Sequence, residues 1–258
     1  MSMTEQINLL FFSLFLLLAV FRPLPLAKRR AAVGLGVLGI AITSVMHSLN
    51  DPSLNDWLPA ALMPLAYWQT GRFFEQPNKT LQAFLERLDQ KVLRDRRRSD
   101  GLEACLELAY FFCYPLVPLG VCVLYLSGLR SQTESYWTAV LPPTYFCYAM
   151  VPFAQTLPPW KSKEGQEKQN PQGSIRMVNM WVVRHLSTQA NTFPSAHVAA
   201  SFAVSLFLLQ LVPLAGWIFL MIALSIAVGA VTGRYHYLAD VLSATAVALA
   251  SFFLTQLV

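Results

Sequence analysis

The chain is poor in charged residues, and this shortage narrows the class of protein it can be. Only 13% of its 258 residues are charged, whereas 55% are hydrophobic. A soluble globular domain has about twice that share of charge. We therefore predict a polytopic membrane protein. The net charge is +5, and the basic residues lie in loops beside apolar segments. Basic residues at such positions orient a membrane protein and contact anionic head groups, so no nucleic-acid partner is expected.

Cysteine is also scarce. The four cysteines lie in apolar segments and lack the spacing of metal ligands. They are interpreted as small buried hydrophobic side chains rather than as a zinc site or a disulfide framework. They are Cys105, Cys113, Cys122 and Cys147.

Apolar runs long enough to cross a bilayer recur along the whole chain. They predict an all-α, polytopic transmembrane helix bundle with about eight spans. The third run contains Pro59 and Pro64 and is short, so a re-entrant segment is an alternative there. The eight predicted spans are 7–24, 31–49, 56–71, 104–127, 136–157, 195–212, 216–233 and 238–257.

The stretch 76–100 differs from these runs because its apolar residues recur at helical spacing among charged ones. It predicts an amphipathic helix on the membrane surface. A solvated connector helix is an equally good interpretation. We expect residues 1–103 to form the N-terminal spans plus this helix, and 104–258 to form the catalytic region of one integrated membrane domain.

Lys and Arg are distributed unevenly between the two sets of loops that eight spans define. All but Arg130 of the 19 fall on one side. Such a bias predicts that this side is cytoplasmic. If the third span does not cross, every later loop changes sides relative to the first.

Two polar clusters flank an uncharged stretch near the C-terminus. The first is Phe193-Pro194-Ser195-Ala196-His197, and the second runs from Gly233 through Arg234-Tyr235-His236 to Asp240. His197 and His236 are 39 positions apart, about 58 Å of helix, which is one span out and one span back. Both histidines are therefore expected on the same side of the membrane.

The residue types in these clusters suit phosphoryl transfer. His236 and Asp240 are spaced i, i+4, so the carboxylate can orient the imidazole and leave Nε2 free as a base or nucleophile. Ser195 opens a predicted helix, where backbone N–H groups favour an anion. Arg234 adds a guanidinium that suits phosphate oxygens. One histidine would attack phosphorus while the other protonates the leaving oxygen.

These motifs resemble the PSGH-type and HxxxD motifs of the type 2 phosphatidic acid phosphatase superfamily. That superfamily includes integral-membrane lipid phosphatases and the related inositol phosphorylceramide synthases. The resemblance covers about residues 104–258 and implies a six-helix phosphatase core in this C-terminal part. It further implies that His236 is the nucleophile, that Asp240 orients it, that His197 is the general acid and that Ser195 binds phosphoryl oxygens. No metal or other cofactor is implied; the partners are a lipid phosphate substrate and membrane lipids.

The chain departs from the superfamily's usual pattern in its basic residues. No Lys-x6-Arg-Pro string lies between Pro158 and Thr192, and the Pro-Pro-Trp-Lys string that ends at Lys161 looks more like the synthase-related branch. The phosphate-binding residues are therefore sought among Lys161, Lys163, Arg176 and Arg184, with Arg176 and Arg184 favoured. Ala230 occupies the position of the family's second Arg, and Arg234 lies four residues later.

The predicted function is hydrolysis of a lipid phosphomonoester or diphosphate through a phosphohistidine. Two alternatives stay open: a lipid phosphotransferase of the same fold, and a non-enzymatic membrane transporter or scaffold. Glu107 is expected either to face the site or to pair with a loop arginine.

Overall fold

The computed structural model describes residues 1–92, 99–161 and 173–255. Within these ranges the chain forms eleven α-helices and two short 3-10 helices, and no strand. The predicted all-α fold is confirmed. Residues 93–98 of the stretch 76–100, which was predicted to form an amphipathic helix, and Lys163 lie outside the described residues.

Three helices form the N-terminal part: α1 (Met3–Phe21), α2 (Leu26–Leu49) and α3 (Pro52–Gly71). Helix α1 begins with a capping box between Ser2 and Glu5, which satisfies two backbone N–H groups. Asp51 accepts hydrogen bonds at the start of α3. Helices α1 and α2 approach closely because Gly39 faces the ring of Phe12, and a Cβ there would lie 2.5 Å from it.

The predicted span 104–127 is wrong as a single straight helix. It consists of α5 (Asp100–Phe111) and α6 (Leu116–Leu126), bent by 71° at the break. Pro115 lies in the break, and its ring nitrogen cannot donate a helical hydrogen bond. Proline also disfavours the helical conformation of the residue before it, Tyr114.

The remaining helices are η1 (Arg130–Gln132), α7 (Thr133–Ala149), η2 (Pro159–Lys161), α9 (Ser174–Leu186), α10 (Ala196–Leu211), α11 (Pro213–Thr232) and α12 (Leu238–Thr255). Helix α10 is central and packs on α6, α7, α11 and α12. Helix α7 ends at Ala149, so the predicted span 136–157 is too long; 150–157 is a turn and loop that includes Pro152. Helix α9 lies between the predicted spans 136–157 and 195–212, where no helix was predicted.

Several long apolar helices indicate a multi-pass membrane protein. Four of the described helices, α1, α2, α11 and α12, are long and apolar enough to cross a membrane, and the bent pair α5–α6 would make a fifth. Eight spans were predicted. Helices α7 and α10, with 17 and 16 residues, are shorter than the roughly 20 that cross a bilayer unaided.

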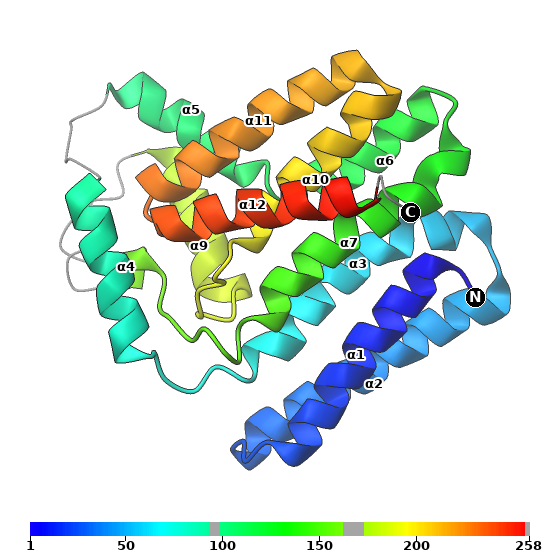
Figure 1. Ribbon diagram of the computed structural model, residues 1–258, viewed down its shortest axis with the longest axis horizontal. Coiled ribbons are helices and arrows are strands. Elements are labelled where there is room, and N and C mark those ends of the chain that lie inside the picture. Colours follow the sequence, from blue (N-terminus) through cyan, green and yellow to red (C-terminus); the bar gives the residue numbers. More distant parts are fainter. Residues whose placement is uncertain (93–98, 162–172, 256–258) are drawn as a thin grey trace.

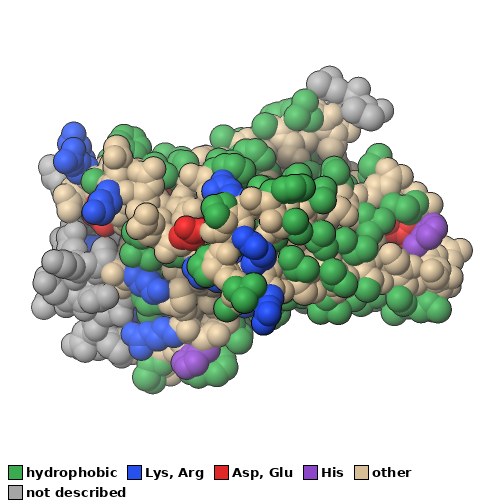
Figure 2. All heavy atoms as spheres, turned by 90° about the horizontal axis from the view of Figure 1, so that it is seen from below, with side chains coloured by type: hydrophobic (Ala, Val, Ile, Leu, Met, Phe, Trp, Pro, Cys, Tyr) green, Lys and Arg blue, Asp and Glu red, His purple; other side chains and the backbone are tan. Residues whose placement is uncertain are grey.

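Polar contacts gather at two opposite ends of the bundle. At one end His47 Nδ1 lies 3.1 Å from a Glu5 carboxylate oxygen, and Arg130 Nε lies 2.8 Å from Asp56. At the other end lie α4 (Lys79–Val92), α9 and the loop between α11 and α12. Figure 2 shows Lys and Arg gathered toward the end that holds α4 and α9, with hydrophobic side chains over the middle. The predicted motifs lie at this basic end.

Candidate active site

His236 lies in the loop that joins α11 to α12, and it contacts Asp240 in the first turn of α12. Their i, i+4 spacing would place both residues on one face of a helix, but α12 begins only at Leu238. Their contact is made nonetheless, because His236 Nδ1 lies 3.2 Å from Asp240 Oδ2. The same oxygen accepts the Tyr237 backbone N–H at 2.9 Å, as an N3 carboxylate does in half of a capping box. Both side chains are buried.

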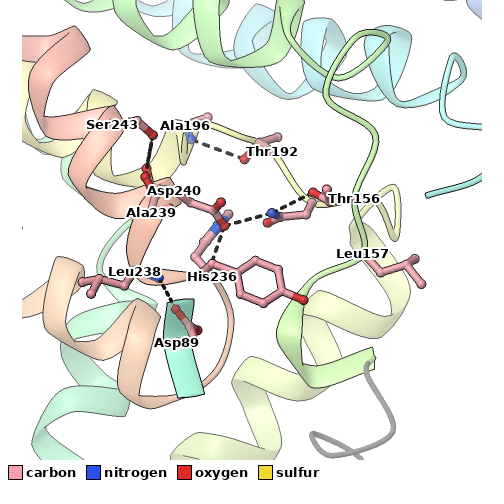
Figure 3. A network of polar contacts seen from close by, with 12 residues as sticks. Asp89, Thr156, Leu157, Thr192, Ala196, His236, Leu238, Ala239, Asp240 and Ser243 are labelled. Carbon is pink, nitrogen blue, oxygen red and sulfur yellow. Dashed lines mark hydrogen bonds and ion pairs between the residues drawn. The ribbon is translucent and has the colours of Figure 1, made fainter. Parts of the chain in front are cut away.

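Asn191 binds the same carboxylate oxygen, and Figure 3 shows the network of polar contacts around Asp240 and Thr156. Asn191 Nδ2 donates to Asp240 Oδ2 at 2.9 Å and lies 3.1 Å from Thr156 Oγ1. The Asn191 backbone N–H donates to the Thr156 carbonyl at 2.8 Å. Neither Asn191 nor Thr156 was predicted from the sequence. The only available signal was the position of Asn191 two residues before the Phe193 cluster.

His197 is the second residue of α10 and faces His236. Their ring centroids lie 6.0 Å apart, with the planes at 72°. Tyr110 and Tyr114 contact the His197 ring edge to face, at 6.0 and 5.4 Å. The structure therefore brings together the two histidines and Asp240, as the motif spacing predicted.

Ser195 is the N-cap residue of α10, and its side chain makes no capping hydrogen bond within the described residues. Its N–H donates to the Asp240 carbonyl at 3.1 Å, which ties α10 to α12. The Ser195 hydroxyl is buried and has no hydrogen-bond partner within the described ranges. A buried hydroxyl without a partner is costly, so this oxygen is suited to bind a group that enters the site.

A stacked pair of tyrosines borders the histidines. Tyr235 lies parallel to Tyr110 with ring centroids 3.9 Å apart. The Tyr235 hydroxyl donates to Glu107 Oε2 at 2.6 Å. Burial raises the pKa of the Tyr235 phenol, and the Glu107 carboxylate raises it further, so the hydroxyl stays protonated.

Arg176 forms an ion pair with Glu107 and is not among the residues that line the site cavity. Asn179 also donates to Glu107 Oε2, at 2.8 Å. Both nitrogens of the guanidinium fork lie 3.5 Å from the Gly233 carbonyl, which opens the loop that holds His236. Of the two expected roles for Glu107, pairing with an arginine from the segment before α10 is the one observed.

The other predicted basic residues lie around the site rather than in the cavity lining. Lys161 Nζ donates to the Gln189 carbonyl at 3.4 Å, and burial lowers its pKa. Arg184 is exposed on α9. Arg234 has a left-handed backbone conformation, with φ of 60°, and its carbonyl accepts the Trp160 N–H at 3.0 Å.

A cavity of about 560 Å³ opens beside the two histidines. Its lining is mostly apolar and aromatic and comes from α3, α5, α6, α9 and α10, together with the loop that bears His236. Within the described part of the chain, none of the lining residues is a Lys, Arg, Asp or Glu. A pocket of this size that joins an apolar body to a few polar groups is typical of a binding site.

The described residues contain no group of three or more His, Cys, Asp or Glu side chains placed to hold a metal ion. The reactive groups that the structure brings together at this site are the two imidazoles, a carboxylate, hydroxyls and nearby guanidinium groups.

The fold and the site define a helical membrane protein with a paired-histidine centre at one end of its bundle. The model of the PAP2 superfamily matches residues 81–254, and the chain belongs to that superfamily. No curated protein and no solved structure matches the chain. The matched region runs from α4 to α12 and contains both histidines and Asp240. Membership suggests a membrane phosphatase or phosphotransferase.

Proposed function

We propose that the protein hydrolyses a lipid phosphomonoester or diphosphate through a phosphohistidine at His236. The observation that carries this proposal is the facing pair His236 and His197, 6.0 Å apart, beside an apolar cavity, with Asp240 bound to the first of them. Members of the superfamily are generally metal-independent phosphatases, which agrees with a site built from imidazoles and a carboxylate.

In the first step the free Nε2 of His236 attacks phosphorus. A nitrogen–phosphorus bond forms and the bond from phosphorus to the leaving oxygen breaks, with its electron pair going to that oxygen. His197 donates a proton to the oxygen, so the lipid leaves as an alcohol, or as a phosphate if a diphosphate is cleaved. Asp240 holds Nδ1–H and stabilises the positive charge that develops on His236.

In the second step water attacks the phosphohistidine. His197, now neutral, accepts a proton from this water, an oxygen–phosphorus bond forms, and the nitrogen–phosphorus bond breaks. Inorganic phosphate leaves, and both histidines return to their starting protonation states. His197 gives up a proton in the first step and regains one in the second, while His236 gains and then loses the phosphoryl group. The cycle therefore needs no reactant besides the lipid phosphate and water.

We assign phosphate binding to Ser195 and the start of α10, with cationic support from the basic residues around the site. The Ser195 hydroxyl lacks a partner within the described ranges, and free N–H groups at a helix N-terminus attract anions. The candidates for that support come from α9, η2 and the loop before α12, and they are Arg176, Arg184, Lys161 and Arg234.

A lipid substrate follows from the chemistry of the cavity. Its mostly apolar and aromatic walls suit a hydrocarbon chain. The loop between α11 and α12, which bears His236, lies at the end of the bundle that holds α4 and α9, where a head group would meet water. The apolar chain would then lie among α3, α5, α6 and α9.

The first alternative is a phosphotransferase that uses the same site. An alcohol would replace water in the second step, and the phosphoryl-linked group would pass to it. The second alternative is a transporter or scaffold that has kept the fold without the chemistry. Such a protein is expected to lack a catalytic residue, whereas this chain retains His197, His236 and Asp240.

The proposal is tested by assaying a panel of lipid phosphates for released phosphate, with the wild type and the His236→Ala variant in the same detergent. We expect release by the wild type and none by the variant, with both proteins eluting identically in size-exclusion chromatography. Full activity of His236→Ala would contradict the mechanism. Product formation that depends on an added alcohol would favour the phosphotransferase.

A further inference from the structure

Helix α4 contacts the two residues that directly follow His236. Asp89 Oδ1 accepts the Leu238 backbone N–H at 3.0 Å (Figure 3). Gln82 Nε2 donates to the Tyr237 hydroxyl at 2.6 Å. These contacts join positions 149 and 155 residues apart in the chain. A helix that is remote in sequence therefore binds the segment that holds the nucleophile.

The Asp89 contact satisfies a group that α12 cannot satisfy by itself. Leu238 is the first residue of α12, and the first N–H groups of a helix have no partner within it. Oδ2 of Asp240, at the third position of α12, is engaged with Tyr237, Asn191 and His236, and neither oxygen of this carboxylate contacts the Leu238 N–H in the described residues. Asp89 supplies the missing acceptor from another helix, and its negative charge complements the positive end of the helix dipole.

Gln82 joins the loop that bears His236 to the segment that contains Thr156 and Leu157. Its Oε1 accepts the Leu157 N–H at 2.9 Å, while its Nε2 reaches Tyr237. Leu157 follows Thr156, which contacts Asn191, and Asn191 donates to Asp240. An amide side chain suits this position because it donates and accepts at once.

The packing of α4 explains why these two residues point inward. Gln82, Leu85 and Asp89 follow an i, i+3, i+7 spacing and so share one face of the helix. Leu85 is fully buried on that face. Arg87 and Lys91 are exposed. The buried face of α4 is therefore the face that carries both hydrogen-bonding residues.

We propose that α4 is part of the active site and that Asp89 and Gln82 are positioning residues for His236. Neither residue lines the cavity, so their effect passes through Tyr237, Leu238 and Leu157. The backbone on the C-terminal side of His236 is held by α4, and this fixes the imidazole against Asp240 and opposite His197. This inference rests on the proposed function in one respect only, that His236 is the reacting group.

The first test compares three variants at α4 in an assay of phosphate release. Asp89→Ala removes the acceptor, Asp89→Asn keeps an acceptor oxygen, and Lys91→Ala changes an exposed residue of the same helix. We expect Asp89→Ala to lower kcat by about 10- to 100-fold with KM nearly unchanged, since displacing a reacting group by about 1 Å has such an effect. Asp89→Asn should recover most of the rate, and Lys91→Ala should match the wild type.

A double-mutant cycle tests Gln82 independently. Gln82→Met and Tyr237→Phe each remove the same hydrogen bond, so the double variant should have the kcat of Gln82→Met alone. If Tyr237→Phe lowers kcat by the same factor in both backgrounds, Gln82 does not act through Tyr237. An unchanged kcat in both Asp89→Ala and Gln82→Met would overturn the proposal.

A third measurement needs no substrate and so separates this inference from the proposed function. Diethyl pyrocarbonate modifies imidazoles, and mass spectrometry reads the rate at each histidine. In Asp89→Ala we expect modification of the buried His236 to speed up several-fold, with His47 at the opposite end of the bundle unchanged. Equal rates at His236 in the variant and the wild type would refute the positioning role, even if no substrate is found. If the wild type releases no phosphate from any lipid tested, but the labelling result holds, only the proposed function is refuted.

Discussion

The rings of His197 and His236 face each other edge to face, with centroids 6.0 Å apart. They come from different elements, the start of α10 and the loop before α12, which meet because Ser195 N–H donates to the Asp240 carbonyl at 3.1 Å. Among the described residues, a carboxylate contacts the ring of His236, at 3.2 Å, and none contacts the ring of His197. This asymmetry supports the proposed division of roles, with the oriented histidine as nucleophile and the other as the proton donor.

Replacing Asp240 by asparagine should strongly reduce turnover while preserving shape. An amide cannot stabilise the positive charge on His236 and favours the wrong imidazole tautomer, which in a comparable triad is worth several orders of magnitude. We expect kcat to fall about 100-fold or more. Steady-state kinetics of phosphate release would measure this, with Ser243→Ala in the same first turns of α12 as the control. Activity within a few-fold of the wild type would contradict the assigned role.

The ion pair of the buried Glu107 and the partly buried Arg176 should behave as a unit. Glu107→Leu leaves an uncompensated guanidinium beside the loop of His236, and breaking a buried pair from one side costs about 3 kcal/mol of stability. The double variant Glu107→Leu, Arg176→Met should recover much of that loss. Thermal unfolding in detergent gives both values.

The same two variants also test whether Arg176 holds the phosphate. If it does, the double variant should be folded yet have a higher KM. If KM is unchanged in the folded double variant, Arg176 supports the loop alone and the phosphate is held by other groups.

Asp89 should make the stability of the protein depend on pH. Burial raises its pKa from 3.8 to about 6; the Leu238 N–H and Arg234 lower it, and Asp240 raises it. The folded state therefore binds this proton more tightly than the unfolded state does. The resulting stabilisation is fully present below about pH 4 and is lost as the pH rises through about 6. The unfolding temperatures of the wild type and Asp89→Asn would be measured between pH 4 and 8. That of the wild type should fall relative to that of the variant as the pH rises across this interval. A constant difference would contradict the assignment.

The basic end of the bundle is predicted to face the cytoplasm, because all but Arg130 of the 19 Lys and Arg residues lie on that side in the eight-span interpretation. In a Cys105→Ser background, a membrane-impermeant maleimide applied to intact cells should label Ser131→Cys but not Glu75→Cys. Both positions are exposed, and they lie at opposite ends. The reverse pattern of labelling would place the histidines on the outer face.

The core of the site could be predicted from sequence because its residues fall in two short clusters. The spacing of His236 and Asp240 fixes their contact locally, and one span out and one back brings His197 to the same end. Asn191, Thr156 and Asp89 could not be found in this way. Asn191 lies 49 residues from Asp240, and Asp89 lies 149 residues from Leu238, so their contacts exist only once the helices have packed.

The fold was predicted in class but not in detail. Hydropathy finds apolar runs but not the points at which they bend, so the break between α5 and α6 was missed although Pro115 was visible. Helix α5, on one side of this bend, packs closely against α11. A Cβ at Gly229 of α11 would lie 2.6 Å from the Leu106 carbonyl oxygen. Helix α9 was missed because its mixed basic and apolar sequence resembles a loop, whereas Asn179, Met180 and Val183 bury one of its faces.

The central claim is that His236 carries the phosphoryl group, and trapping that intermediate tests it most directly. The wild type would be mixed with a lipid phosphate it cleaves, quenched in alkali, in which phosphohistidine survives, and digested for mass spectrometry. Our account predicts a phosphoryl group on His236 in the wild type and none in His236→Ala, with no phosphate released by that variant. A phosphoryl group on another residue, together with undiminished turnover by His236→Ala, would contradict it.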